Sequence, residues 1–143
     1  AMAKLLVLLG ASWAAAQLGL RAETLWVGGQ GITLPWLVAA GLATAWIFVM
    51  ANAVNFMDGA NGIAMGTALI ILCALAMMLA PSVLYAPDQK AAAMLLWFLL
   101  AAAAAIGGFL FWNLRGLLFA GDAGALSVGG LIGGASVMFA MTG

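Results

Sequence analysis

Long apolar runs separated by short polar breaks are the dominant pattern of this sequence. The runs cover residues 5–20, 35–51, 63–80, 91–112 and 125–143. Each is close to the length of about 20 residues that a helix needs to cross a hydrocarbon layer about 30 Å thick. The runs do not alternate apolar and polar residues, as the strands of a membrane barrel would. The pattern predicts an all-α, polytopic membrane helix bundle with about five transmembrane helices in a single domain, 1–143.

The connection at residues 22–34 contains a turn signal. Gly28-Gly29-Gln30-Gly31 is flanked by Trp26-Val27 and by Ile32-Thr33-Leu34. Apolar and β-branched residues on both sides of glycines fit a small β-hairpin at the membrane interface. A plain loop anchored by Trp26 fits equally well, because tryptophan suits the interfacial belt. The sequence leaves both structures open.

Proline and glycine indicate where the later helices end and pack. The second helix is expected to begin at Pro35 and continue to Asn55, and Pro81-Ser82 is expected to end the third. Small residues four apart allow close helix contact, as at Gly62 and Gly66. The last run contains two interleaved pairs with this spacing, formed by Gly129, Gly130, Gly133 and Gly134. We expect that helix to pack against others.

Composition narrows the function classes. Hydrophobic residues make up 68% of the chain and charged residues 6%, with a mean hydropathy of +1.24 and a net charge of zero. These values are far outside the range of soluble domains, and no basic patch indicates nucleic acid as a partner. The chain has no histidine, which excludes histidine chemistry within it. Its one cysteine, Cys73, excludes a disulfide framework and a CxxC metal pair.

Two polar breaks carry the candidate chemistry. The first holds Asn52, Asn55 and Asp58 at i, i+3 and i+6, so they share one helical face if the helix continues, and it ends with Asn61-Gly62. The second, residues 113–124, holds the remaining candidates, Asn113, Arg115 and Asp122. Two spans separate Asp58 from Asp122, so both carboxylates are expected on the same side of the membrane.

Carboxylates and carboxamides at one membrane face suit a hard divalent cation. Magnesium prefers oxygen ligands and is usually held by one or two carboxylates together with substrate phosphates. Each break also precedes a helix, whose N-terminal amides favour phosphate. The residues thus indicate a metal-bridged phosphate compound at the membrane surface. The alternative is simple helix capping, for which Asp and Asn are ordinary residues.

The first break resembles the signature of the polyprenyl-phosphate N-acetylhexosamine-1-phosphate transferases, glycosyl transferase family 4. The matching residues, 52–64, read NAVNFMDGANGIA. Residues 119–125, FAGDAGA, resemble the second signature of that family, usually written FMGDxGS. The order of the signatures and the intervening spans agree, and residues 28–34 resemble the family's small outer-face hairpin. The resemblance covers the whole chain, as the middle part of a longer transferase.

The resemblance implies a reaction. A sugar-1-phosphate, usually N-acetylhexosamine-1-phosphate, passes from a UDP-sugar, UDP-N-acetylhexosamine, to polyprenyl (undecaprenyl) phosphate, and UMP is released. Magnesium is required, and the active face is the cytoplasmic face of the cell's inner (plasma) membrane. The reaction starts a lipid-linked glycan for the cell envelope. A homodimer is considered as the assembly.

Residue roles follow by matched position. Asp122 would be the magnesium ligand and Asp58 an essential catalytic acid, with Asn55 and Asn52 supporting substrate or metal. Three further residues of the two breaks are interpreted as substrate-binding: Asn61, Asn113 and Arg115. These roles suit phosphoryl transfer, which depends on alignment and charge neutralisation more than on covalent chemistry.

The sequence also departs from the family pattern. Asn61 replaces the second aspartate of the first signature, and Ala120 and Ala125 replace a methionine and a serine of the second. An acidic pair expected before the first helix and a basic, histidine-containing loop expected after the last are not within the chain. The departures indicate a fragment that is inactive alone or a degenerate homologue. Asn61 favours enzymes that start lipopolysaccharide O-antigen or similar glycans over the peptidoglycan-precursor branch.

A different class of function is also compatible with the pattern. The chain can be read as a non-catalytic membrane bundle or a transporter piece, with Asp58 and Asp122 as ion-path residues. Transporters place such groups near the bilayer midplane. Both aspartates lie at the ends of apolar runs, which favours a site at the membrane surface.

Overall fold

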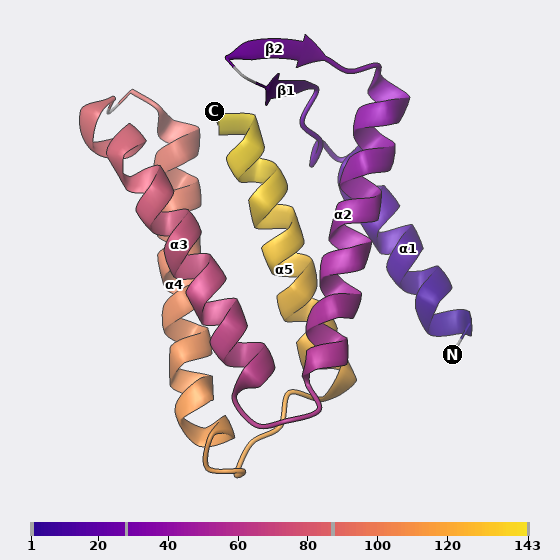
Figure 1. The fold of residues 1–143 in the computed structure, drawn as a ribbon, viewed down its shortest axis with the longest axis vertical. Helices are drawn as coiled ribbons and strands as arrows, with labels where there is room; N and C mark the ends of the chain where they lie inside the picture. The colour runs from indigo at the N-terminus through magenta and orange to yellow at the C-terminus, as the bar shows by residue number, and fades with distance from the viewer. Residues whose placement is uncertain (1, 28, 87, 143) are drawn as a thin grey trace.

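The computed structural model describes residues 2–27, 29–86 and 88–142 of the chain. Within them the helices are α1 (Met2–Gln17), α2 (Trp36–Met57), α3 (Ile63–Tyr85), α4 (Lys90–Asn113) and α5 (Gly121–Thr142) (Figure 1). Strands β1 (Thr24–Val27) and β2 (Gln30–Thr33) lie between α1 and α2. The predicted all-α bundle is therefore confirmed.

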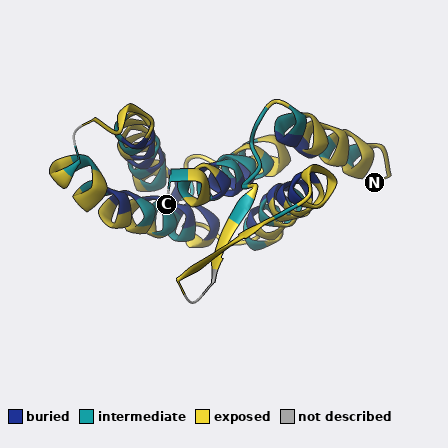
Figure 2. Ribbon diagram, turned by 90° about the horizontal axis from the view of Figure 1, so that it is seen from above, coloured by how far each residue is buried: buried dark blue, intermediate teal, exposed yellow. Residues whose placement is uncertain are grey.

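Four of the described helices have the length and composition of membrane spans. They are α2, α3, α4 and α5, each of 22 to 24 residues, whereas α1 has only 16. Only 22% to 39% of the most apolar window of each is buried inside the bundle. Figure 2 shows exposed residues along the outer helix faces. Apolar helices with exposed outer faces are suited to a hydrocarbon solvent, so the chain is a multi-pass membrane protein.

The two helix boundaries that lie furthest from the prediction are the end of α3 and the start of α5. Pro81 lies inside α3, which continues to Tyr85, so the expectation that Pro81 and Ser82 end this helix is wrong. Proline removes one backbone hydrogen bond, but Leu79 before it belongs to the core cluster shared with α4 and Val83 after it packs against that cluster, which favours a continuous helix. Helix α5 begins at Gly121, four residues before the expected start at Ala125. This earlier start places Asp122 in the first turn of α5.

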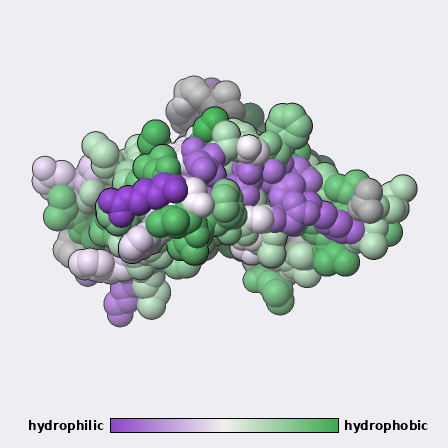
Figure 3. Space-filling view, turned by 90° about the horizontal axis from the view of Figure 1, so that it is seen from below, coloured by the Kyte–Doolittle hydropathy of each residue, from purple (hydrophilic) through white to green (hydrophobic). Residues whose placement is uncertain are grey.

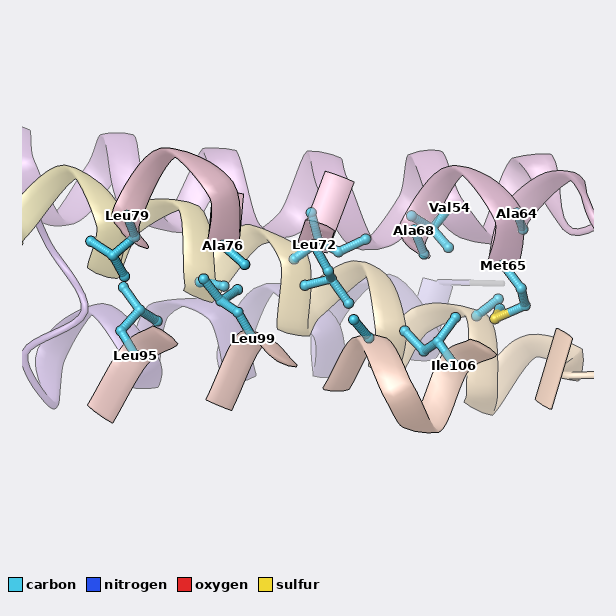
Figure 4. Close-up of a cluster of buried hydrophobic side chains, with 14 of the residues drawn as sticks. Val54, Ala64, Met65, Ala68, Leu72, Ala76, Leu79, Leu95, Leu99 and Ile106 are labelled. Carbon is cyan, nitrogen blue, oxygen red and sulfur yellow. The ribbon is translucent and has the colours of Figure 1, made fainter. Parts of the chain in front are cut away.

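The main core lies where α3 packs on α4. Ala64, Ala68, Leu72 and Ala76 recur every fourth position along α3 and are buried. Figure 4 shows this stripe facing Leu95, Leu99 and Ile106 of α4. Small side chains let two helices approach closely, which matters in a membrane because the lipid is as apolar as the core.

Helices α2 and α5 pack through glycine. A Cβ atom built on Gly129 would lie 2.6 Å from the Cα atom of Ala51, and one on Gly133 would lie 2.9 Å from that of Ile47. The prediction that the glycines of this run pack on another helix is thus confirmed for one of its two pairs. A Cβ on Gly130 would meet nothing within 4 Å among the described residues, and the same is true of Gly66.

The first connection forms the hairpin rather than the plain loop. Strands β1 and β2 are antiparallel, with Thr24 opposite Thr33 and Trp26 opposite Gly31. The hairpin lies at the end of the bundle that also carries the C-terminal end of α5 (Figure 1). The connections from α2 to α3 and from α4 to α5 lie at the opposite end.

Candidate functional site

The two polar breaks lie side by side at one end of the bundle. Asp58 ends α2 and Asp122 stands in the first turn of α5, at the lower end in Figure 1. A view of that end shows hydrophilic residues forming a band between hydrophobic ones (Figure 3). The prediction that both aspartates occupy the same side of the bundle is therefore confirmed.

Asn113 joins the breaks from within. Its side chain is buried, with 3% of its surface exposed. Its Oδ1 atom accepts a hydrogen bond of 2.8 Å from the backbone N–H of Gly62, and its Nδ2 atom donates one of 2.8 Å to the carbonyl of Leu118. A buried amide whose oxygen and nitrogen are both hydrogen-bonded to the backbone fixes the chain on both sides of it. Asn113, interpreted from the sequence as substrate-binding, therefore uses both of its polar atoms inside the chain.

Glycines allow the two breaks to approach. Gly62 and Gly116 have φ angles of +84° and +69°, in the left-handed region that favours glycine. A Cβ atom on Gly62 would collide with the side chain of Leu114, and one on Gly116 would lie 3.3 Å from the Nδ2 atom of Asn61. The exposed Asn61 therefore lies directly against the second break.

Asp122, Lys4 and Asn55 form a polar cluster from three helices, which we call the Asp122 cluster. The Nζ atom of Lys4 lies 2.8 Å from Oδ2 of Asp122. With the Asn55 amide assigned so that its nitrogen faces Asp122, Nδ2 donates to Oδ1 of Asp122 at 3.1 Å. In the same orientation its oxygen accepts from Nζ of Lys4 at 3.3 Å. Each of the three residues thus contacts the other two.

Asn52 lies on α2 with Asn55, whereas Asp58 directly follows the last residue of that helix. Asn52 and Asp58 are both half-buried. The backbone N–H of Asp58 donates to the carbonyl of Asn55 at 3.4 Å. Among the described residues, no side chain forms a hydrogen bond or ion pair with the Asp58 carboxylate. The Nδ2 atom of Asn52 donates to the carbonyl of Phe48, one turn earlier, at 2.8 Å. The Asp58 carboxylate therefore remains available to a ligand, whereas the amide nitrogen of Asn52 is already hydrogen-bonded.

Arg115 supplies a second cation at this end. Its Cζ atom lies 3.8 Å from the centroid of the Phe111 ring and 5.7 Å from that of Trp112. Aromatic faces attract a guanidinium and limit its orientations. The residue is exposed, so it is accessible to an anionic ligand beside the second break.

The donor set fits a magnesium ion that is held partly by substrate. Among the described residues, no group of three or more His, Cys, Asp or Glu side chains lies close enough together to hold a metal. Asp122, with 74% of its side chain exposed, offers hard carboxylate oxygens. Magnesium commonly takes one or two carboxylates and completes its shell with phosphate and water. The residues present suit this mode and not a cage made by the protein alone.

Lys4 is the site residue that sequence reasoning did not identify. A lysine before an apolar run is ordinarily an interfacial anchor, so the position of Lys4 in the sequence gives no reason by itself to place it in a site. Span counting already places it on the side of Asp58 and Asp122, whereas Lys90, the other lysine, falls on the opposite side. Lys4 is thus the one of the two lysines that shares a side with both aspartates, and this is the signal that could have identified it.

Comparisons with known proteins show which ones this chain resembles in sequence. Residues 1–140 match the family model described as glycosyl transferase family 4. The chain is 31% identical over 123 residues to a phospho-N-acetylmuramoyl-pentapeptide-transferase of Beutenbergia cavernae, a match that covers 76% of this chain and 32% of the relative. It is 36% identical over 106 residues to the protein of the same name from Corynebacterium kroppenstedtii, covering 67% and 28%.

These relatives are longer proteins. A third, from Streptococcus sanguinis and with the same name, is 30% identical over 92 residues, covering 64% of this chain and 26% of the relative. The matches thus extend over about a third or less of each curated relative. No solved structure matches the chain.

Proposed function

Because this chain belongs to glycosyl transferase family 4, we propose that it forms the membrane core of a sugar-1-phosphate transferase. The donor is a UDP-N-acetylhexosamine or a derivative of one, and the acceptor is polyprenyl phosphate. An oxygen of the lipid phosphate attacks the phosphorus that bears the sugar. The bond from that phosphorus to the UMP oxygen breaks, so the products are polyprenyl-diphosphate sugar and UMP.

The observation that carries this proposal is the meeting of the two signature breaks at one end of the bundle. Residues from four helix ends meet there. The hydrogen bond from Gly62 to Asn113 joins α3 to α4, and the contact between Asn55 and Asp122 joins α2 to α5. Phosphoryl transfer requires that nucleophile, phosphorus and leaving group be aligned and their charge neutralised. A polar surface held by a buried amide supports that role better than scattered capping residues would.

In this proposal each site residue has its own role. Asp122, and with it the free carboxylate of Asp58, would hold magnesium, which would neutralise charge on the diphosphate when bound. Asn55 orients Asp122, while Asn61 and Arg115 lie on the exposed surface where a diphosphate or uridine would contact them. Asn52 supports the end of α2, which carries Asn55 and leads directly to Asp58. In the same proposal this end of the bundle faces the cytoplasm, and the membrane is the plasma membrane.

The identity of the donor sugar is also a proposal. The relatives are named for transfer of a phospho-N-acetylmuramoyl-pentapeptide. That name gives no support to the O-antigen interpretation drawn from Asn61, so both a muramoyl-pentapeptide and a simpler N-acetylhexosamine belong in the test. We further propose that the 143 residues alone do not turn over substrate, because Lys4 and Arg115 are too few cations for a nucleotide diphosphate beside a lipid phosphate.

The test is an assay of UMP release by the whole protein purified in detergent. Polyprenyl phosphate is supplied with UDP-N-acetylglucosamine or with UDP-N-acetylmuramoyl-pentapeptide, with magnesium or with EDTA. We expect release with one donor that requires both the lipid and the metal. Failure with every donor, together with ion flux in proteoliposomes that depends on Asp58 and Asp122, would favour the transporter alternative.

A further inference from the structure

Lys4 contacts the carboxylate of Asp122, the group that the proposed function assigns to a metal ion. Its ammonium nitrogen lies 2.8 Å from Oδ2, and the Asn55 amide nitrogen lies 3.1 Å from Oδ1. Both oxygens of the carboxylate therefore have a partner from another helix. A magnesium ion binds a carboxylate oxygen at about 2.0–2.1 Å. On Oδ2 it would bring two like charges next to each other unless the ammonium moved away.

We propose that Lys4 and a divalent cation are alternative partners of the Asp122 carboxylate, so that Lys4 lowers the affinity of the site for metal. The inference rests on the proposed function in one respect, the assignment of Asp122 as a metal ligand. Without metal, Lys4 holds α1 against the first turn of α5. When metal binds, the ammonium leaves Oδ2 and is available to an oxygen of the substrate phosphates.

Exposure makes this exchange feasible. The Lys4 side chain is 35% exposed and that of Asp122 is 74% exposed, so water and ions reach the pair without any unfolding. Ion pairs in such surroundings are weak and easily exchanged. Asn55 offers the displaced ammonium a second partner, because its oxygen already lies 3.3 Å from Nζ of Lys4. Lys4 is thus a positioning residue that acts on the metal through Asp122.

The experiment measures binding of Mn²⁺ as a probe to the whole protein in detergent, by electron paramagnetic resonance of the free ion. We expect Lys4→Met to bind Mn²⁺ roughly two- to fivefold more tightly than the unaltered protein, as loss of a weak exposed ion pair allows. Lys4→Arg keeps the charge and should retain the original affinity. Lys90→Met, which removes the lysine at the opposite end, is the matched control and should have no effect.

A second measurement keeps the proposal testable if Lys4→Met does not fold. Reductive ¹³C-methylation of lysine in the unaltered protein gives an NMR resonance for Lys4, which is assigned by its loss in Lys4→Arg. Mg²⁺ should shift this resonance and leave that of Lys90 in place, and Asp122→Asn should abolish the shift. A resonance that Mg²⁺ does not move would overturn the exchange.

The outcomes separate this inference from the proposed function. If Mn²⁺ binds, Asp122→Asn weakens the binding and Lys4→Met leaves it unchanged or weaker, then only the role of Lys4 is wrong. If Asp122→Asn leaves Mn²⁺ binding unchanged, then the assignment of Asp122 as a metal ligand fails and the competition fails with it.

Discussion

Gly129 of α5 lies against the backbone of Ala51 in α2, so closely that an added Cβ atom would be 2.6 Å from the Cα atom of Ala51. Gly133 has the same relationship to Ile47 one turn further along. These two contacts fix the height of α5 beside α2. They thereby set Asp122, in the first turn of α5, level with Asn55 near the end of α2.

This relationship predicts that Gly129→Ala destabilises the protein. The new methyl group would have to displace backbone, which cannot move away as a flexible side chain could, so we expect a loss of about 1–3 kcal/mol. Gly130→Ala is the matched control, because its Cβ atom would meet nothing within 4 Å among the described residues. The melting temperatures of the two variants are compared in detergent, with size-exclusion chromatography as the measure of the protein that remains folded after heating. Equal melting temperatures for both variants would show that this close contact is absent.

Asn113 provides a second stability prediction. Asn113→Ala leaves the N–H of Gly62 and the carbonyl of Leu118 without their partner. Loss of a buried partner costs about 1–3 kcal/mol, and we also expect UMP release to fall because the breaks separate. Asn61→Ala, at an exposed position in the first break, should change stability by no more than about 0.5 kcal/mol. A fully stable Asn113→Ala protein would contradict the joining role of this amide.

The arrangement of the breaks also predicts accessibility in sealed vesicles. In a Cys73→Ala background, single cysteines at Asn61 and at Ala123 should react with a membrane-impermeant maleimide from the same side. A cysteine at Asp88, on the connection between α3 and α4, should react from the other side, because one span separates it from each break. Labelling of positions 61 and 123 from opposite sides would contradict the topology.

The sequence predicted the framework well because the framework depends on periodic, local signals. The length of the apolar runs predicted the five helices. The glycines around Gln30 predicted a hairpin as one of the two structures that the sequence left open. Span counting put Asp58 and Asp122 at the same end, which requires no knowledge of packing. The spacing of Gly129 and Gly133 indicated a close helix contact, although not which helix would supply it.

The details that were missed depend on tertiary contacts. Pro81 looks like a helix end in the sequence, yet packing of α3 on α4 carries the helix past it. Helix α5 begins at Gly121, which has a φ angle of +61° that glycine readily adopts, four residues before the apolar run on which the prediction was based. Lys4 is 118 positions from Asp122, so no local pattern connects them. Nor does a sequence tell whether the amide of Asn113 faces a ligand or the protein.

The last prediction concerns activity and separates the site from the rest of the charged surface. In the whole protein, Asp122→Asn should reduce UMP release by at least about 100-fold, because the amide keeps the shape but loses the charge that would hold a metal on the diphosphate. Asp88→Asn is the matched control, since it makes the same change in an exposed aspartate at the opposite end. It should leave the rate within about twofold of the unaltered enzyme, as expected for a surface substitution. Asp122→Asn should also retain the melting temperature within a few degrees, because its ion pair with Lys4 is largely exposed. Equal rates in the two variants would remove Asp122 from the site, whereas a lower rate with a much lower melting temperature would make its role structural.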